Sequence, residues 1–365
     1  MSYIPSFKIT PLMVKYLGAI DASKAIVERL PIPFGIEQEL CHVASVKMSH
    51  YSTKIEGNRL TLKQTEELLS GKDILAREID KKEVMNYYDC LEFIQRVAKA
   101  KKPLTGELIQ EMHSIIEKGI LKGKLRGHYR EAQNAIFDSH TRKPVYFPPE
   151  TKDVKPFMED FVAWLNQKNE LHPALKAGIA HYRFVVIHPF MDGNGRVARA
   201  LATLILYLEN YDLRKLYSLE EYYAEDLQGY YLALQNCHGP NYYDTPDPDI
   251  TLWLEYFLKG VGIVFEEVRQ KVEEATKQAV VTSKNEDDRK LLENIGPREK
   301  RVLGYFKKTT QLRRKNLCIL FQIKDRSAGD LLKKWILMGL LERKGSGFRD
   351  AYYVLSENYR RLIED

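Results

Sequence analysis

The chain has 365 residues, of which 44% are hydrophobic and 29% charged, a composition typical of soluble globular proteins and not of disordered or fibrous ones. Its formal net charge of +6 is mild and favours an ordinary soluble protein over a dedicated nucleic-acid binder. The four widely spaced cysteines exclude a C-x-x-C zinc knuckle and indicate no disulfide framework, and without an apolar run of membrane-spanning length we expect a cytoplasmic protein.

Helical periodicity dominates the chain, because apolar residues recur every three or four positions in most segments. The first expected helix covers residues 36–55 and ends before Gly57, the residue type that favours a helix C-terminus. A capping box from Thr61 to Gln64 then begins a helix through Leu69. Further helices are expected at residues 82–99, 105–120, 151–167, 174–186, after Gly195, at 230–237 and at 250–265.

One segment departs from the helical pattern. Residues 127–130 and 145–149 flank a polar stretch, which predicts a short β-hairpin whose proline-bounded arm cannot extend into a larger sheet. Such a hairpin suits an extended peptide that pairs with its edge. The alternative is a surface excursion between two helices.

The composition changes beyond about Glu267. Residues 272–293 are rich in Lys, Glu, Asp and Gln, which predicts an exposed helix or connector. After Pro297 we expect three short helices (298–306, 312–320, 327–338) and two strands (340–343, 351–355) around a turn at 344–347, an order that resembles a winged helix-turn-helix. Its cations would suit a DNA backbone, but the same fold also serves in protein docking or as a homodimer interface. These cations are Lys324, Arg326, Lys333, Lys334, Lys344 and Arg349.

The most informative run is residues 188–199, HPFMDGNGRVAR. Gly193 and Gly195 allow φ > 0 and the close approach of a ligand, and the helix that begins after them should point its free N–H groups at one spot. The N-terminus of a helix attracts an anion. Arg196 and Arg199 lie three residues apart on one helical face, where both can bind phosphate oxygens, while an apolar stripe buries the opposite face.

The remaining residues of this run suggest the chemistry. His188 carries an imidazole whose ordinary pKa suits a general base. Asp192 offers an oxygen ligand for Mg²⁺, although an aspartate at this place can also be a simple turn former. Pro189 and Phe190 are expected to be structural. The run therefore predicts a nucleotide phosphate site at which His188 deprotonates an incoming hydroxyl.

The run 188–199 resembles the signature of the Fic (filamentation induced by cAMP) domain, H-[PX]-F-x-[DE]-G-N-G-R-x-x-R, at every defined position. The resemblance continues upstream through residues 172–182 and the expected hairpin, and covers about residues 35–265. It implies a Fic-type helical bundle whose hairpin is a flap that aligns the target. It also implies adenylylation, the transfer of AMP from ATP to a Ser, Thr or Tyr hydroxyl of a protein, which is another protein or the chain itself.

The resemblance assigns a role to each residue of the motif by its position. His188 would be the base, and Asp192 would bind Mg²⁺. Gly193, Asn194 and Gly195 would form an anion hole for the α- and β-phosphates. Arg196 would contact the β-phosphate and Arg199 the γ-phosphate. The nucleoside would lie near Tyr230. Many relatives carry Asn-Arg where this chain has Glu225-Asp226, so no nucleoside contact is assigned beyond Tyr230.

A second element, residues 52–57, resembles the inhibitory motif [ST]-x-x-x-E-[GN] through Ser52, Glu56 and Gly57. Glu56 follows Ser52 by four residues and so shares its helical face, from which its carboxylate could pair with Arg199. An arginine held in this way is unavailable to the γ-phosphate, which predicts autoinhibition. The same architecture could also remove AMP, with Glu56 orienting a water molecule. Taken alone, the Glu-Gly pair is only a helix end.

We therefore predict a mainly α protein of four parts: an N-terminal helical segment with the inhibitory helix (1–100), a Fic core (101–265), a connector (266–296) and a winged-helix domain (297–365). The predicted activity is that of an autoinhibited protein adenylyltransferase with ATP as co-substrate and Mg²⁺. Two alternatives remain. One is a winged-helix DNA-binding regulator whose Fic core senses a nucleotide, and the other is transfer of a different group of a nucleotide-like donor.

Overall fold

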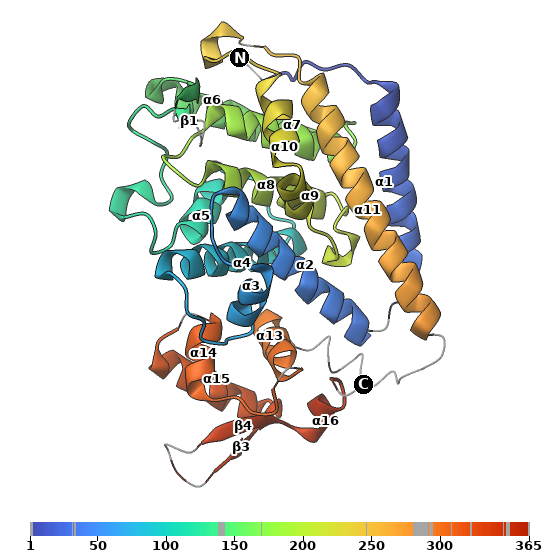
Figure 1. The fold of residues 1–365 in the computed structure, drawn as a ribbon, viewed down its shortest axis with the longest axis vertical. Helices are drawn as coiled ribbons and strands as arrows, with labels where there is room; N and C mark the ends of the chain where they lie inside the picture. The colour runs from blue at the N-terminus through green and yellow to red at the C-terminus, as the bar shows by residue number, and fades with distance from the viewer. Residues whose placement is uncertain are drawn as a thin grey trace.

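The computed structural model describes residues 3–363 except 31, 33, 138–142, 169, 246, 280–290, 292–294, 308, 322, 346 and 348–350. Within these residues the chain is mainly helical and contains two separate antiparallel pairs of short strands (Figure 1). The predicted fold class, a Fic-type helical bundle with small hairpins, is confirmed. None of the described helices combines the length and the apolar character needed to cross a membrane.

Most helices follow the expected order with small shifts of their ends, but the helices at 11–29 and 219–225 were not expected, and the helix expected at 250–265 extends to residue 279. Those of the N-terminal and central parts are α1 (Pro11–Arg29), α2 (Phe34–Ile55), α3 (Leu62–Leu69), α4 (Glu78–Lys99), α5 (Gly106–Ile116), α6 (Thr151–Leu165), α7 (Pro173–Ile187), α8 (Asn194–Leu208), α9 (Leu219–Glu225), α10 (Leu227–Gln235) and α11 (Thr251–Ala279). The expected capping box begins α3, since Thr61 accepts a hydrogen bond from the backbone of Gln64 and the Gln64 side chain accepts one from the backbone of Thr61.

The helix α8 lies at the centre of the bundle. We expected one buried stripe and one free face, but nearly every residue from Asn194 to Tyr207 is buried. The reason is tertiary: α7, α4, α5 and α2 all pack against α8 and enclose it. Its two arginines are therefore buried side chains and not surface cations.

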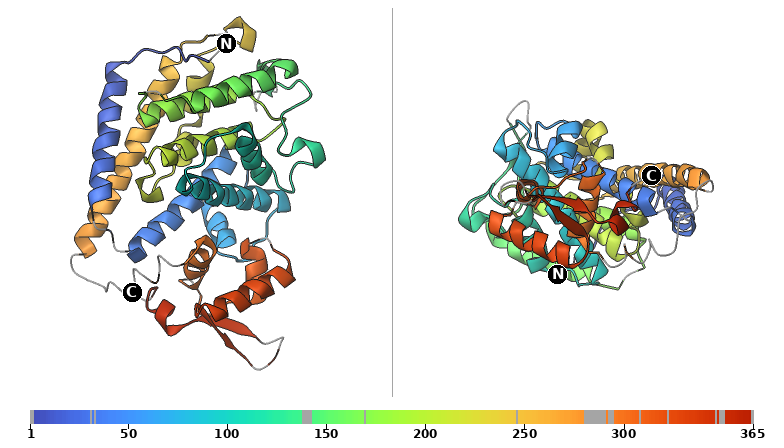
Figure 2. Two further views of the ribbon diagram at one scale, coloured as in Figure 1. Left: turned by 180° about the vertical axis from the view of Figure 1, so that it is seen from behind. Right: turned by 90° about the horizontal axis from the view of Figure 1, so that it is seen from below.

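An N-terminal helix, α1, was not expected, and it packs along α11 (Figures 1 and 2). Its start carries ordinary signals, since Thr10 caps it by accepting a hydrogen bond from Met13 N and Pro11 occupies its first position. The helix α11 runs without a break through the expected domain boundary at residue 265, because Val268 and Val272 belong to the same buried core. Most of the expected connector beyond α11 lies outside the described residues.

The first hairpin consists of β1 (Ile136–Phe137) and β2 (Pro144–Tyr146), with Ile136 opposite Tyr146. The second arm was expected almost where it lies, but the first arm was expected at 127–130 and that prediction is wrong. Gly127 adopts φ +77°, and the backbone N–H of Arg130 donates to Pro189 O at 2.8 Å instead of to a neighbouring strand. Residues 138–142, between the strands, lie outside the described part of the chain.

The C-terminal segment forms a small module with its own core around Trp335. Its elements appear in the predicted order, α13 (Pro297–Phe306), α14 (Arg314–Phe321), α15 (Asp325–Leu337), β3 (Leu341–Lys344) and β4 (Tyr352–Leu355), followed by the short α16 (Glu357–Arg360). The module lies below α2, α3 and α4 (Figures 1 and 2). Arg301 joins the two parts, because its guanidinium stacks 4.2 Å from the ring of Tyr88 and lies 3.7 Å from Asp89 on α4. The assignment of the C-terminal module as a winged helix stays a prediction.

The close crossing of α7 and α11 at Gly178 can be tested by substitution. A Cβ atom at Gly178 would lie 2.9 Å from Phe257 and 3.0 Å from Leu254, and Trp253 Nε1 donates to Gly178 O at 2.8 Å. We expect Gly178→Ala to lower the free energy of unfolding by about 1–3 kcal/mol, because the added methyl group overpacks the core. Denaturant unfolding measures this change.

The matched control is Gly18→Ala. Gly18 lies exposed inside α1, and a Cβ atom there would meet nothing within 4 Å. Because alanine favours a helix over glycine, this variant should be more stable by about 0.5–1 kcal/mol. A Gly178→Ala protein as stable as the Gly18→Ala protein would refute the close crossing.

Candidate active site

The loop between α7 and α8, residues 188–193, is shaped by two residues with left-handed backbone. His188 ends α7 with φ 50°, and Gly193 precedes α8 with φ 76°. Asn194 ties the loop together, because its Oδ1 accepts from Phe190 N at 2.9 Å and its Nδ2 donates to Phe190 O at 2.8 Å. Both polar atoms of the Asn194 side chain thus bond within the loop.

Two buried side chains that we did not predict support this loop from outside. Gly127 N donates to His113 Nδ1 at 2.9 Å, so the proton of this imidazole lies on Nε2, which donates to Asp192 O at 3.1 Å. The imidazole also stacks on Phe190 with a centroid distance of 3.8 Å. Arg130 donates from Nε to His188 O at 3.0 Å and from Nη2 to the carbonyl of Pro149. The loop is therefore held rigidly between α5 and the base of the hairpin.

A weak sequence signal existed for one of these two residues. His113 interrupts the apolar stripe of its helix, and a polar side chain on a buried face needs a partner. Arg130 gave no such signal, since its acceptors are carbonyl oxygens of residues far away in the chain.

The predicted base, His188, is half-buried and has one free nitrogen. Its Nδ1 lies 3.1 Å from Val185 O, so the neutral ring donates from Nδ1 and keeps the lone pair of Nε2 available. Burial lowers the pKa of His188 to about 4. At neutral pH the imidazole is therefore uncharged and can accept a proton.

Arg199 is buried and is held by the two residues that the inhibitory motif singles out. Its Nη2 lies 2.7 Å from Glu56 Oε1, its Nε donates to Ser52 Oγ at 3.0 Å, and Nη2 also donates to Ser52 O at 2.9 Å. Burial opposes the ionisation of Glu56, but the charges of Arg199 and Arg196 and the hydrogen bond from Arg199 together lower the pKa of the carboxyl. Gly57 follows with φ +91°, where α2 has just ended.

Arg196 is also buried, and its main partner was not expected. Its Nη2 lies 3.0 Å from Glu117 Oε1, and the side chains of Arg196 and Glu117 are 3% and 0% exposed. Two further carboxylates approach less closely, that of Asp192 at 3.7 Å and that of Glu83 at 3.8 Å. Burial raises the pKa of Glu117 to about 7, and Arg196 acts in the opposite direction.

The two glycines of the turn are needed because these carboxylates come so close. A Cβ atom at Gly193 would collide with Glu117 Oε1, and one at Gly195 would collide with Glu56 Oε1. We predicted that a ligand approaches the backbone here. In the structure, a carboxylate of the chain itself lies against each glycine.

The last two predicted site residues differ in their surroundings. The side chain of Asp192 is 62% exposed, and its Oδ1 accepts from Gly193 N at 2.6 Å. Tyr230 is buried, and its hydroxyl lies 3.1 Å from His181 Nε2 while its ring stacks on Tyr223. It packs in the aromatic core beside Arg199.

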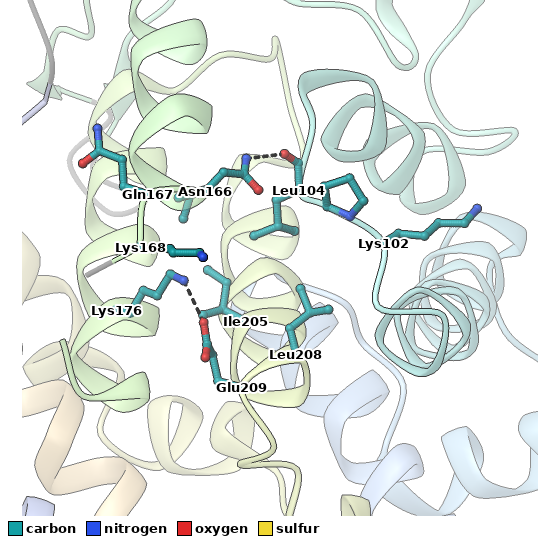
Figure 3. Close-up of a pocket in the computed structure, with 11 residues that line it drawn as sticks. Lys102, Leu104, Asn166, Gln167, Lys168, Lys176, Ile205, Leu208 and Glu209 are labelled. Atoms are coloured by element: carbon teal, nitrogen blue, oxygen red, sulfur yellow. Dashed lines mark hydrogen bonds and ion pairs between the residues drawn. The ribbon is translucent and has the colours of Figure 1, made fainter. Parts of the chain in front are cut away.

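A cavity of about 370 Å³ lies at the other end of α8 (Figure 3). It is lined by Leu104, Lys176, Ile205, Leu208 and Glu209, among others, and Lys176 pairs with Glu209 across it at 2.7 Å. No predicted site residue lines this cavity, so it is separate from the loop at His188.

Comparison with known proteins agrees with the signature. Residues 103–206 match the model of the Fic/DOC family. The protein adenylyltransferase Fic of Drosophila mojavensis is 34% identical over 170 residues, which cover 44% of this chain and 32% of that protein. The chain thus spans about a third of the length of this curated relative.

Two solved structures share the fold. A Fic family protein from Desulfovibrio desulfuricans matches with a TM-score of 0.61 and 23% identity over 97% of this chain and 99% of that one, which shows the fold alone. Fic-1 from C. elegans matches with a TM-score of 0.54 and 27% identity over 73% of each chain. Residues 103–206 therefore match the Fic/DOC family, and the chain is a distant homologue of protein adenylyltransferase Fic over the part of its length that aligns.

Proposed function

We propose that the chain is a protein adenylyltransferase that Glu56 holds in an inhibited state. One arrangement carries this proposal: the neutral imidazole of His188, with Nε2 free, lies on a rigid loop next to the N-terminus of α8 and its two buried arginines. A base next to an anion site is what the transfer of a nucleotide to a hydroxyl needs. The distant homology to protein adenylyltransferases supports the same activity.

In the proposed reaction, the oxygen of a protein hydroxyl attacks the α-phosphorus of ATP. The bond between the α-phosphorus and the bridging oxygen to the β-phosphate breaks, and pyrophosphate leaves. His188 Nε2 takes the proton of the hydroxyl. Asp192 O accepts from His113 and His188 O accepts from Arg130, so both backbone carbonyls stay in place during the reaction.

The residues present fit a magnesium ion that is bound mainly by phosphates and water. Asp192 is largely exposed and contributes one carboxylate, and among the described residues no group of three or more His, Cys, Asp or Glu side chains could form a complete metal site. Mg²⁺ commonly binds through one or two carboxylates together with substrate phosphates. When bound, the ion would neutralise phosphate charge.

The proposed inhibition follows from the contacts of Arg199. Glu56 and Ser52 accept its hydrogen bonds from Nε and Nη2, so these donors are occupied before a nucleotide arrives. A γ-phosphate would have to displace the carboxylate of Glu56. Because Glu56 lies on the turn after α2 and its side chain is 31% exposed, it can move aside without opening the core.

The target is a protein hydroxyl, on another protein or on the chain itself, and the hairpin of β1 and β2 is the proposed place where it pairs. Removal of AMP, transfer of another group, homodimer formation and DNA binding by the C-terminal module remain predictions. Two of the six predicted cations of that module are paired with carboxylates, Lys334 with Glu299 and Lys344 with Glu342, and Arg349 lies outside the described residues.

Loss of Glu56 should raise the transferase activity, and loss of His188 should abolish it. With ATP labelled at the α-phosphate, Glu56→Gly should label protein about 10- to 100-fold faster than wild type, because the hydrogen bonds between charged groups that occupy Arg199 are removed. His188→Ala should lower the rate by about 10²- to 10⁴-fold, since the base is lost. Autoradiography of the purified protein mixed with a cell extract measures both.

The control for the first variant is Arg59→Gly, which removes an exposed side chain three residues further along the same turn. It should label like wild type. Equal labelling by wild type, Glu56→Gly and His188→Ala would contradict the proposal.

The pH dependence of the rate should reflect a base with a low pKa. Burial lowers the pKa of His188 to about 4, and the base works only when it is unprotonated. The labelling rate of Glu56→Gly should therefore stay flat between about pH 6 and 8 and fall as the pH approaches 4. A rate that halves at about pH 6.5, the ordinary pKa of histidine, would show that burial does not lower the pKa of His188 in this site.

A further inference from the structure

We propose that Glu117 is a second internal carboxylate that restrains phosphate binding, because its charge faces Arg196 at 3.0 Å as the charge of Glu56 faces Arg199. The inference rests on the proposed function in one respect, namely that the anion bound at this turn belongs to a nucleotide. It adds a positioning residue from α5, a helix that contains no part of the signature or of the inhibitory motif.

The two carboxylates reach the turn from different elements. Glu56 follows the end of α2, whereas Glu117 is the residue that ends α5. Each lies within 3.0 Å of one arginine, and each touches the backbone of one glycine of the turn. A phosphate chain laid along Gly193 and Gly195 therefore meets a carboxylate at both positions.

The surroundings of Glu117 do not suit a purely structural ion pair. Its side chain is fully buried, and neither of its oxygens has a hydrogen-bond partner in the described part of the chain. A buried carboxylate is costly unless hydrogen bonds satisfy its lone pairs. Glu117 balances the charge of Arg196, but a glutamate kept for stability alone would have hydrogen bonds to its oxygens.

Arg196 has donors to spare for an anion. Its Nε and Nη1 are buried and make no hydrogen bond with any described residue, while Nη2 faces Glu117. Three carboxylates, those of Glu117, Asp192 and Glu83, lie within 4 Å of this one guanidinium. Part of its positive charge is thus already compensated, and an incoming phosphate gains more from it once one of these carboxylates is removed or withdraws.

The test is the binding of inorganic tripolyphosphate to the full chain, measured by isothermal titration calorimetry. This probe has the phosphate chain of ATP and no nucleoside. Glu117→Gln keeps the size of the side chain and removes its charge, and it should bind the probe about tenfold more tightly than wild type. Glu111→Gln, the same change at an exposed position of α5, should bind like wild type.

A second pair of variants tests whether Glu117 acts through Arg196. In the background Arg196→Gln, the change Glu117→Gln should no longer tighten binding, which a merely structural role would not explain. Should Glu117→Gln fail to fold, as its thermal unfolding would reveal, Glu117→Asp withdraws the carboxylate by one methylene group and should also tighten binding. Equal or weaker binding by the Glu117 variant, or a gain that persists without Arg196, would overturn the inference, as would no binding by any variant.

The labelling assay separates this inference from the proposed function. If Glu117→Gln tightens tripolyphosphate binding but Glu56→Gly transfers no AMP, the proposed activity is wrong and the role of Glu117 stands. If Glu56→Gly transfers AMP but Glu117→Gln does not change the affinity for tripolyphosphate, only the inference about Glu117 is wrong.

Discussion

The structure depends on two positive charges that are buried at the first turn of a buried helix. Arg196 and Arg199 both lie on α8, which α7, α4, α5 and α2 enclose. A buried guanidinium needs a counter-charge, and the chain supplies one from each side, Glu117 and Glu56. These two pairs link the ends of α5 and α2 to the start of α8, next to the loop that carries His188. Any change in the charge balance of α8 therefore also changes the site.

Under the proposed function, a site balanced in this way is inhibited by its own carboxylates. The N-terminus of α8 and its arginines offer a strong field for phosphate, but carboxylates of the chain already occupy the places at Gly193 and Gly195. A nucleotide must therefore compete with groups that are present at an effective concentration no free anion reaches. Control of the site then becomes a question of what moves these carboxylates. The C-terminal module packs against α3, contacts α4 through Arg301, and approaches the first half of α2 through Lys307, which lies 3.7 Å from Glu39.

Local patterns in the sequence were sufficient for much of this picture. Helix period and capping residues predicted most helices, including the capping box at Thr61. The resemblance to the inhibitory motif, with Ser52 and Glu56 on one helical face, predicted the pair of Glu56 and Arg199 that the structure contains. The pair of Arg196 and Glu117 could not be predicted in this way, because the two residues lie 79 positions apart and no motif joins them. The predicted position of the first hairpin arm was wrong for a related reason, because Arg130 forms hydrogen bonds with a distant loop and not with a strand.

The central claim is that the chain transfers AMP to a hydroxyl that His188 deprotonates, once Glu56 releases Arg199. The most direct measurement is intact-protein and peptide mass spectrometry of Glu56→Gly and of the double variant Glu56→Gly, His188→Ala after incubation with ATP and Mg²⁺. The account predicts that Glu56→Gly gains the mass of an adenylyl group on a Ser, Thr or Tyr side chain and that the double variant does not. An adenylyl group gained without His188, or a phosphoryl group gained in its place, would contradict the account.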